Sequence, residues 1–366
     1  MPTTDVVIVG GGCVGTSVSY HLADVGCTDT LLLEAGALGS GSTGKAAGGI
    51  RVQHDDEVNS RLALRSLEEF THFEEMTGTP IDLNQVGYLF LLDNEGHLAE
   101  FTRAARRQNE LGIPTELIAP GDVERFSPGL VTDDLVGATY CPLEGYATPE
   151  AVVQGYAKAA RRLGARIRTG APVVEVLVDG QGVCGVRTAD ETISTRTVVV
   201  AAGIESGTLT APLGYEIPVE GLPRTIHYTS RDAGVPREAP LVVDFSSGFY
   251  YHREGDGLIF AGRESDLEQL VEPATRRLPS LAEVPVESSW WGYYDMSPDH
   301  NAIVGSAPIS GLHYATGFSG HGFMQSPAVG EFVAQSVLGL PTTLDLSAMS
   351  GDRFVEGRSR VESFVI

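Results

Sequence analysis

The chain has 366 residues, more than one compact domain usually holds, so we expect two domains of unequal size. Hydrophobic residues make up 42% and charged residues 20% of the chain, values typical of a globular protein and not of a disordered one. The 48 acidic residues outnumber the 25 basic ones and leave a net charge of -23, which argues against nucleic acid or an anionic membrane as a partner.

The first 150 residues alternate strand and helix patterns. Asp5–Val9 is expected to form a buried parallel strand, followed by a glycine-rich turn and a helix that ends near Asp24. The elements expected next are a strand at Leu31–Glu34, a Gly/Ser/Thr-rich loop at Gly39–Gly49, a helix at Glu57–Met76, a strand at Val86–Leu92 and a helix at Glu95–Leu111.

A second strand–helix region starts near residue 148. Thr148 is expected to cap a helix that has Pro149 at its first position and ends near Leu163. Strands are then expected at Val173–Leu177, Cys184–Arg187, Thr197–Ala201, Leu241–Asp244, Gly248–His252 and Leu258–Gly262, and strand-like segments dominate between Pro223 and Tyr294. The chain ends with a strand (Leu312–Thr316), a glycine-rich loop (Gly317–Gly322) and a helix (Phe323–Leu338). Strand–helix units at the start, middle and end predict an α/β fold in which a Rossmann-like domain is interleaved with a smaller mixed-β domain.

The first turn has the spacing of a dinucleotide-binding site. Gly10, Gly12 and Gly15 form GxGxxG between a strand and a helix. They permit the tight turn, the approach of the backbone to a pyrophosphate and close helix packing. Glu34 ends the second strand, where a carboxylate accepts ribose hydroxyls. An acid at this position disfavours a 2′-phosphate and leaves FAD or NAD.

Two further segments favour FAD. The Gly39–Gly49 loop offers Ser42 and Thr43 among glycines, which suits a longer stretch of phosphate and ribitol. Val198–Ala201 is a buried strand that breaks at Ala202-Gly203, where a backbone can lie against a flavin, although another core strand would look alike.

Taken together, these segments resemble the D-amino-acid oxidase superfamily of flavoproteins, and most closely its sarcosine oxidase group, which includes the β subunits of dye-linked L-proline dehydrogenases. The matching stretches are GGGCVG (Gly10–Gly15), GSTGKAAGGIR (Gly41–Arg51), VVVAAG (Val198–Gly203), MSPDHNAIVG (Met296–Gly305) and GFSGHGFMQSPAVGE (Gly317–Glu331). The last two are specific to the group, whereas the first is shared by many flavoproteins.

The resemblance implies an FAD-binding domain at residues 1–80, 145–220 and 296–366, and a substrate domain at 81–144 and 221–295. It implies FAD bound without a covalent link, because Met296 and the Ala147–Thr148 region stand where tethering relatives have a cysteine or a histidine. The residues expected to hold FAD are Gly10, Gly12, Val14, Gly15, Glu34, Ser42, Thr43, Lys45, Ala46, Ala47, Val174, Ala202, Gly203, Gly320, His321, Gly322, Phe323 and Met324.

The resemblance also implies oxidation of an amino-acid C–N bond by hydride transfer to flavin N5. Arg51 matches an arginine that holds the substrate carboxylate, a task that suits a planar charged fork. Tyr251 matches a tyrosine that reaches the substrate, and His321 lies in the loop that opens the last helix, where it would contact the flavin or be structural. His252 is expected to be structural. A core tyrosine remains the alternative reading of Tyr251.

At three positions the sequence differs from relatives in this superfamily, and these differences restrict the implied function. Tyr294 stands where glycine and D-amino-acid oxidases have a carboxylate-binding arginine, which disfavours a D-amino-acid oxidase. Met324 replaces a lysine that often follows GHGF, and Ile259 aligns with the lysine that assists oxygen reduction in monomeric sarcosine oxidases. The chain is therefore expected to be a dehydrogenase that passes electrons to an acceptor other than oxygen.

The expected substrate is a secondary or N-methylated amino acid such as L-proline, sarcosine or dimethylglycine. The alternatives are a D-amino-acid or 2-hydroxy-acid oxidase or dehydrogenase, and a non-catalytic flavin-carrying subunit of a larger complex. A partner subunit is possible both for the enzyme and for the non-catalytic flavin-carrying subunit.

Composition adds expectations about the environment. The only lysines are Lys45 and Lys158, and an acidic, lysine-poor surface stays hydrated in molar salt, so we expect a halophilic protein. The cysteines lack metal-ligand spacing, so free thiols, no metal and a reducing cytoplasm are expected; they are Cys13, Cys27, Cys141 and Cys184. Because the first strand is expected this close to Met1, no signal peptide is expected, and since no apolar run is long enough, no membrane span is expected either.

Overall fold

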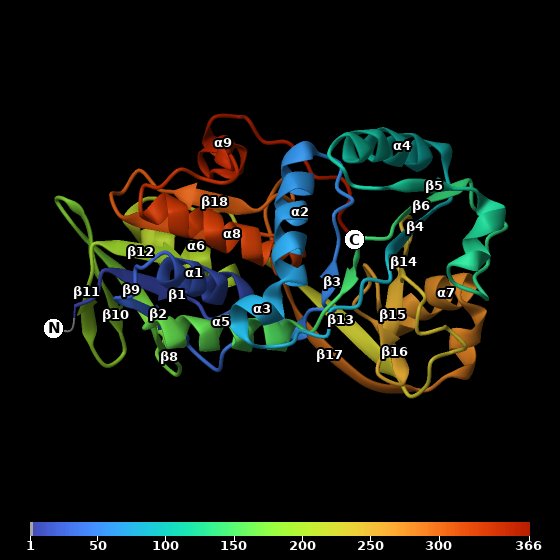
Figure 1. Cartoon of the computed structure of the whole chain (residues 1–366), viewed down its shortest axis with the longest axis horizontal. Helices are drawn as coiled ribbons and strands as arrows, with labels where there is room; N and C mark the ends of the chain where they lie inside the picture. The colour runs from blue at the N-terminus through green and yellow to red at the C-terminus, as the bar shows by residue number, and fades with distance from the viewer. Residues whose placement is uncertain (1–2) are drawn as a thin grey trace.

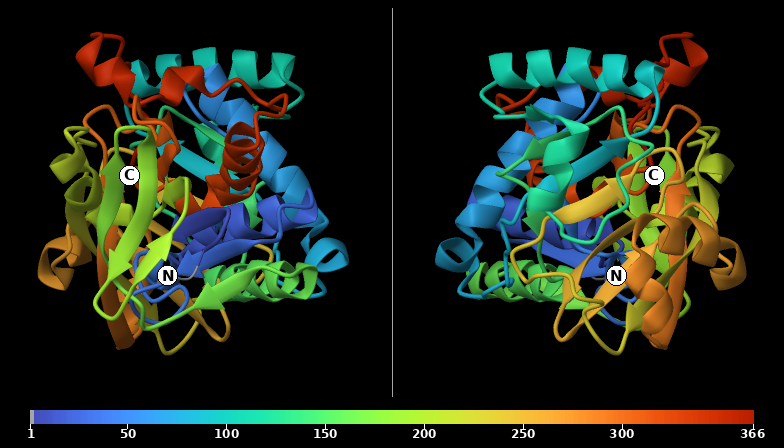
Figure 2. Two further views of the ribbon diagram at one scale, coloured as in Figure 1. Left: turned by 90° about the vertical axis from the view of Figure 1, so that its left-hand side faces the viewer. Right: turned by 90° about the vertical axis from the view of Figure 1, so that its right-hand side faces the viewer.

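Two large sheets, joined at their inner ends by α2 (Glu57–Thr71) and β3 (Gly49–Ile50), organise the chain (Figure 1). The computed structural model describes residues 3–366. Figure 2 shows the two ends of the molecule, with a small three-stranded sheet at the end that holds the N-terminus and α7 (Leu267–Arg277) at the other. No helix within residues 3–366 combines the length and the apolarity needed to cross a lipid bilayer.

The first sheet has six strands in the order β18-β19-β12-β1-β2-β8. All neighbours pair in parallel except β18, which runs antiparallel to β19. The strands are β1 (Val6–Val9), β2 (Thr30–Leu33), β8 (Arg166–Arg168), β12 (Thr197–Val200), β18 (Ile303–Ser306) and β19 (Leu312–Thr316). Such a sheet, drawn from the start, middle and end of the chain, confirms the expected α/β fold.

Both faces of this sheet are buried, which explains its continuous apolar strands. One face packs on α1 (Cys13–Asp24), α5 (Pro149–Leu163) and α8 (Gly322–Val337). The other packs on a three-stranded sheet of β9 (Val173–Asp179), β10 (Gly182–Thr188) and β11 (Thr192–Ser194). Successive residues of β1 alternate between the two cores, with Ile8 on the helical side and Val7 and Val9 on the other.

The second sheet has eight strands in the order β17-β13-β16-β15-β14-β4-β6-β5. They are β4 (Tyr88–Leu92), β5 (Glu116–Ile118), β6 (Gly137–Cys141), β13 (Glu220–Thr229), β14 (Leu241–Asp244), β15 (Tyr250–Glu254), β16 (Gly257–Ala261) and β17 (Val286–Met296). One face is covered by α7 (Leu267–Arg277), and the other packs on α4 (Glu95–Glu110) and the C-terminal Phe364. The domain limits expected from the sequence remain a prediction, which the separation of these two sheets supports.

Three local expectations differ from the structure. The helix expected at Glu57–Met76 is two helices, α2 (Glu57–Thr71) and α3 (Phe73–Thr77), because His72 between them leaves the helical conformation. Thr148 precedes α5 without a capping side-chain hydrogen bond, although Pro149 does begin the helix. Helix α7 went unpredicted because it is short, contains Pro273 and lies in a strand-rich region. The remaining helices are α6 (Ser206–Thr210) and α9 (Asp352–Val355).

A buried polar cluster joins α1, α2 and α5 behind the first sheet. Glu69 is 3% exposed and accepts hydrogen bonds from Tyr156 Oη at 2.6 Å and from His21 Nε2 at 3.2 Å. The other ring nitrogen of His21 contacts the Ser17 carbonyl at 2.9 Å, so the imidazolium form satisfies both acceptors. Burial disfavours that charged form, but the Glu69 carboxylate outweighs burial and raises the pKa of His21.

We predict that Glu69→Ala lowers the free energy of unfolding by about 3–5 kcal/mol, because it leaves a buried histidine and a buried hydroxyl without their partner. The stability that the His21 charge contributes should fade as pH rises through its raised pKa. Urea unfolding measures both effects. Glu68→Ala, on the exposed face of the same helix, is the control and should change stability by less than about 0.5 kcal/mol. Equal losses for the two variants would contradict this account.

Candidate active site

The first glycine turn is shaped to receive a dinucleotide. A Cβ on Gly10 would lie 2.2 Å from the Ala201 carbonyl oxygen, and one on Gly15 would lie 2.0 Å from the Gly10 carbonyl oxygen. Only glycine therefore allows β1, β12 and α1 to meet this closely. Helix α1 begins after Gly12, which has no side chain to cap it, and has no acid in its first turn, so its positive dipole end and the N–H groups after Cys13 can meet an anion.

Glu34 and Thr43 contact the backbone of this turn. The Glu34 carboxylate accepts N–H groups of Gly11 and Gly36, both at 2.7 Å, and so stands over the glycines where a ribose would lie. Thr43 Oγ1 accepts the Cys13 N–H at 3.1 Å, which brings the Gly39–Gly49 loop onto the start of α1. These groups fit the phosphates and ribose of FAD.

The other residues expected to hold FAD occupy varied environments. Ser42 and Lys45 are exposed, Ala46 and Ala47 are half-buried, and Val14 is buried in α1. A Cβ on Gly203, whose φ is +55°, would meet no atom within 4 Å, so this turn after β12 faces open space. Val174 lies on β9 with 56% of its side chain exposed. The roles of these residues remain predictions.

A second uncapped helix start lies beside the first. Helix α8 begins after His321 with no capping side chain and no acid in its first turn. Its Gly322 carbonyl lies 3.6 Å from Cys13 Sγ in α1, so both N-terminal ends open on the same side of the sheet. Gly320 must be glycine here, since a Cβ would lie 2.7 Å from the ring of Tyr294. Phe323 and Met324 are buried in the first turn of α8.

Asp295 anchors this second loop, a role that the sequence motif did not reveal. Its Oδ2 accepts the Gly317 N–H, and its carbonyl oxygen accepts the Ser319 N–H, both at 2.9 Å. Desolvation raises the pKa of Asp295 to about 6, while the backbone donors favour its carboxylate form. The acid therefore stabilises the turn from which α8 begins.

Arg51 is buried at the junction of the two sheets. It follows β3 (Gly49–Ile50) and is 2% exposed. Nη1 donates to the Gln53 carbonyl at 3.0 Å, Nη2 lies 2.7 Å from His321 Nε2, and the guanidinium carbon lies 5.5 Å from the centre of the Phe90 ring. Within residues 3–366 it forms no ion pair, so part of its donor fork is available to a carboxylate.

His321 serves Arg51 as a neutral acceptor. Burial and the Arg51 charge together hold the pKa of His321 well below its usual range. His54, whose ring meets that of His321 edge-on at 5.1 Å, has its pKa lowered for the same reasons. The structure thus brings Arg51 and His321 together, and adds His54, which no motif had indicated.

The structure does not bring Tyr251 to this site, which corrects the expectation from the sequence. Its hydroxyl lies 2.7 Å from Ser127 Oγ in the core beneath α7. Side chains alternate along β15, so Tyr250 instead faces the core that contains Phe90. The pairing of β15 with β16 indicates that Tyr250, and not Tyr251, faces this side. Ile259, expected near the flavin, pairs with His252, and His252 lies on the same face of β15 as Tyr250.

His252 is structural, as expected. One ring nitrogen contacts the Arg253 carbonyl at 2.8 Å, the other contacts the Ala47 carbonyl at 2.9 Å, and the ring stacks on Tyr146 at 4.0 Å. This histidine therefore ties β15 to the Gly39–Gly49 loop of the other sheet.

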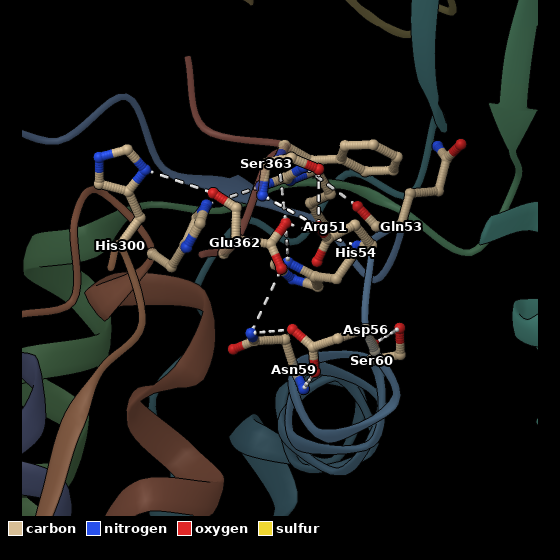
Figure 3. A network of polar contacts seen from close by, with 12 residues as sticks. Arg51, Gln53, His54, Asp56, Asn59, Ser60, His300, Glu362 and Ser363 are labelled. Carbon is tan, nitrogen blue, oxygen red and sulfur yellow. Dashed lines mark hydrogen bonds and ion pairs between the residues drawn. The ribbon is translucent and has the colours of Figure 1, made fainter. Parts of the chain in front are cut away.

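The C-terminal segment supplies one side of the site, also unforeseen. Figure 3 shows Glu362 between His54 and the start of α2. Glu362 is 1% exposed, and its oxygens accept hydrogen bonds from Asn59 Nδ2 at 3.3 Å and the Phe364 N–H at 3.1 Å. Burial and the neighbouring Asp55 raise the pKa of Glu362 well above its usual range, which favours its neutral form. Two residues later, Phe364 stacks on Phe101 of α4 at 3.9 Å.

Comparison with known proteins gives a consistent result. The sequence pattern of the family described as FAD dependent oxidoreductase (DAO) matches residues 5–336. The chain is 29% identical to 4-methylaminobutanoate oxidase (formaldehyde-forming) of Paenarthrobacter nicotinovorans, over 95% of this chain and 45% of that protein. It is 28% identical to human mitochondrial sarcosine dehydrogenase, over 92% of this chain and 40% of that protein. The chain thus spans less than half the length of these two relatives.

Among solved structures, the L-proline dehydrogenase from P. horikoshii superposes with a TM-score of 0.91 at 30% identity, covering 99% of this chain and 100% of that one. The similarity therefore includes both sheets and the junction where Arg51 lies.

Proposed function

The chain belongs to the DAO family of FAD-dependent oxidoreductases, and we propose that it oxidises the C–N bond of a secondary or N-methylated amino acid such as L-proline, sarcosine or dimethylglycine. The observation that carries the proposal is Arg51, a buried cation without an ion-pair partner in residues 3–366, beside the uncapped start of α8. Relatives named for sarcosine, 4-methylaminobutanoate and L-proline support this substrate class.

In the proposed reaction, FAD supplies the hydride acceptor, and the protein binds and orients the substrate. Arg51 holds the substrate carboxylate through its free N–H groups, while His321 keeps the guanidinium in place by accepting from Nη2. Phe90, Tyr250 and Ile259 belong to one buried cluster that excludes water. The start of α8 favours negative charge on the pyrimidine edge of the cofactor. Held in this way, the neutral amine is oriented for transfer.

We further propose a dehydrogenase that works with an acceptor other than oxygen, with or without a partner subunit, in a reducing cytoplasm. Apolar side chains at Ile259 and Met324, which are 3% and 7% exposed, offer no fixed positive charge for reduced oxygen species. The free state of all four cysteines supports the choice of compartment.

Anaerobic mixing with a panel of amino and hydroxy acids tests the function. We expect L-proline, sarcosine or dimethylglycine to bleach the flavin within the turnover time, and an artificial dye to reoxidise it at least about tenfold faster than air. Bleaching only by 2-hydroxy acids, or by no member of the panel, would contradict the proposal. The latter result would favour a flavin-carrying subunit. Reoxidation in air as fast as turnover would make the protein an oxidase.

We predict that Arg51→Ala weakens substrate binding about tenfold to a hundredfold, because a charged hydrogen bond is typically worth about 1.5–3 kcal/mol. Flavin content should stay at the wild-type level. Arg237→Ala removes an exposed arginine and serves as a control with unchanged affinity. If Arg51→Ala instead loses FAD and keeps its substrate affinity, Arg51 is a cofactor residue and the assignment is wrong.

A further inference from the structure

Glu144 is a fully buried acid that lies against the segment following Arg51. It is 0% exposed and precedes β7 (Gly145–Tyr146), which pairs with β3 so that Ile50 lies opposite Gly145. Its own carbonyl oxygen accepts the Gly87 N–H at 2.8 Å. The register of this short ladder therefore brings Glu144 alongside the chain that leaves β3 at Arg51.

All the side-chain hydrogen bonds of Glu144 go to that segment. Oε1 accepts the N–H groups of Val52 at 2.5 Å and Gln53 at 2.7 Å, while Oε2 accepts Gln53 Nε2 at 2.6 Å. Gln53 in turn offers its carbonyl oxygen to Arg51 Nη1 at 3.0 Å. The carboxylate thus holds the N–H groups of Val52 and Gln53, and the guanidinium donates to the carbonyl oxygen of that same Gln53. His321 contacts the guanidinium from the other side.

This arrangement makes the stability of the fold depend on pH. Burial raises the pKa of Glu144 to about 7, although its hydrogen bonds and the Arg51 charge favour the carboxylate. Because the folded-state pKa is raised, the stability contributed by this group is lost as pH rises from 4.5 to about 7. An apolar residue would avoid that cost, so the contacts made by the carboxyl group point to a role at Arg51.

We propose that Glu144 is a positioning residue that fixes the Val52–Gln53 peptide and thereby aims Arg51 at the substrate carboxylate. The proposal rests on the proposed function, because it takes Arg51 as the group that binds the anion. We attribute the orientation of Arg51 to the length of the Glu144 side chain and not to its charge.

Two conservative variants distinguish the contribution of the length of the Glu144 side chain from that of its charge. Glu144→Gln keeps the length and loses the charge; its amide can donate to Gln53 Oε1, which has no hydrogen-bond partner in this structure, once the Gln53 amide turns over. Glu144→Asp keeps the charge but is one methylene shorter, so it cannot reach both backbone N–H groups and the Gln53 amide from the same backbone position. Glu69→Asp shortens an equally buried acid that does not contact Arg51, and serves as the matched control.

The measurement is binding of 2-furoate, followed by its perturbation of the flavin absorption spectrum, with the uncharged 2-furamide as reference ligand. We expect Glu144→Asp to weaken 2-furoate binding by about tenfold or more, as loss of buried hydrogen bonds implies. Glu144→Gln and Glu69→Asp should stay within about threefold of the wild type. Binding of 2-furamide should be the same in all variants.

The proposal is overturned if Glu144→Gln weakens 2-furoate binding as much as Glu144→Asp, or if neither variant changes it. Weaker binding of both ligands in Glu144→Asp would also overturn it, because the effect would then not act through the anion site. Since the assay needs no turnover, a chain that oxidises no amino acid would refute the proposed function while the furoate series still tests Glu144. A wild type that binds both ligands equally would overturn both.

Discussion

A hydrogen bond of 2.7 Å between Arg51 Nη2 and His321 Nε2 joins the two halves of the site. Arg51 comes from the end of β3, where the chain crosses between the sheets, and His321 stands at the start of α8 against the six-stranded sheet. Burying a guanidinium without a counter-ion is costly, so its surroundings must compensate. They do so with the Gln53 carbonyl, a neutral imidazole and the face of Phe90. A carboxylate ligand would complete that set.

The same logic applies to the two helix starts. Neither α1 nor α8 has a capping side chain on the residue before it or an acid in its first turn, although their first residues are largely buried. In α1 the Cys13 N–H is taken by Thr43. Buried N–H groups without partners are unfavourable, and an anionic ligand satisfies them. Glycines at positions 10, 15 and 320 keep side chains out of the close contacts around these starts. These backbone donors would meet the negatively charged groups of FAD under the proposed assignment.

Motifs that act through local geometry were predictable from sequence. The glycine turn, Glu34 and the loop before α8 are marked by residue types at short, fixed spacings, and Arg51 and His321 followed from family motifs. Tyr251 was placed wrongly because a one-residue shift in a strand reverses the face of every side chain, and only the pairing of β15 with β16 fixes that face. Glu144 and Glu362 escaped notice because their partners lie far along the chain, at residues 52–53 and at Asn59, and no local pattern marks such a contact.

We propose that recognition of a substrate carboxylate by Arg51 decides which amines are oxidised. Anaerobic flavin reduction by a matched pair, L-proline and pyrrolidine or sarcosine and dimethylamine, tests this claim most directly because each pair differs only in the carboxylate. The concentration dependence of the reduction rate gives the dissociation constant for each compound. The account predicts that the amino acid binds at least about tenfold more tightly than the amine, the difference expected for a charged hydrogen bond. Equal dissociation constants within a pair would contradict it.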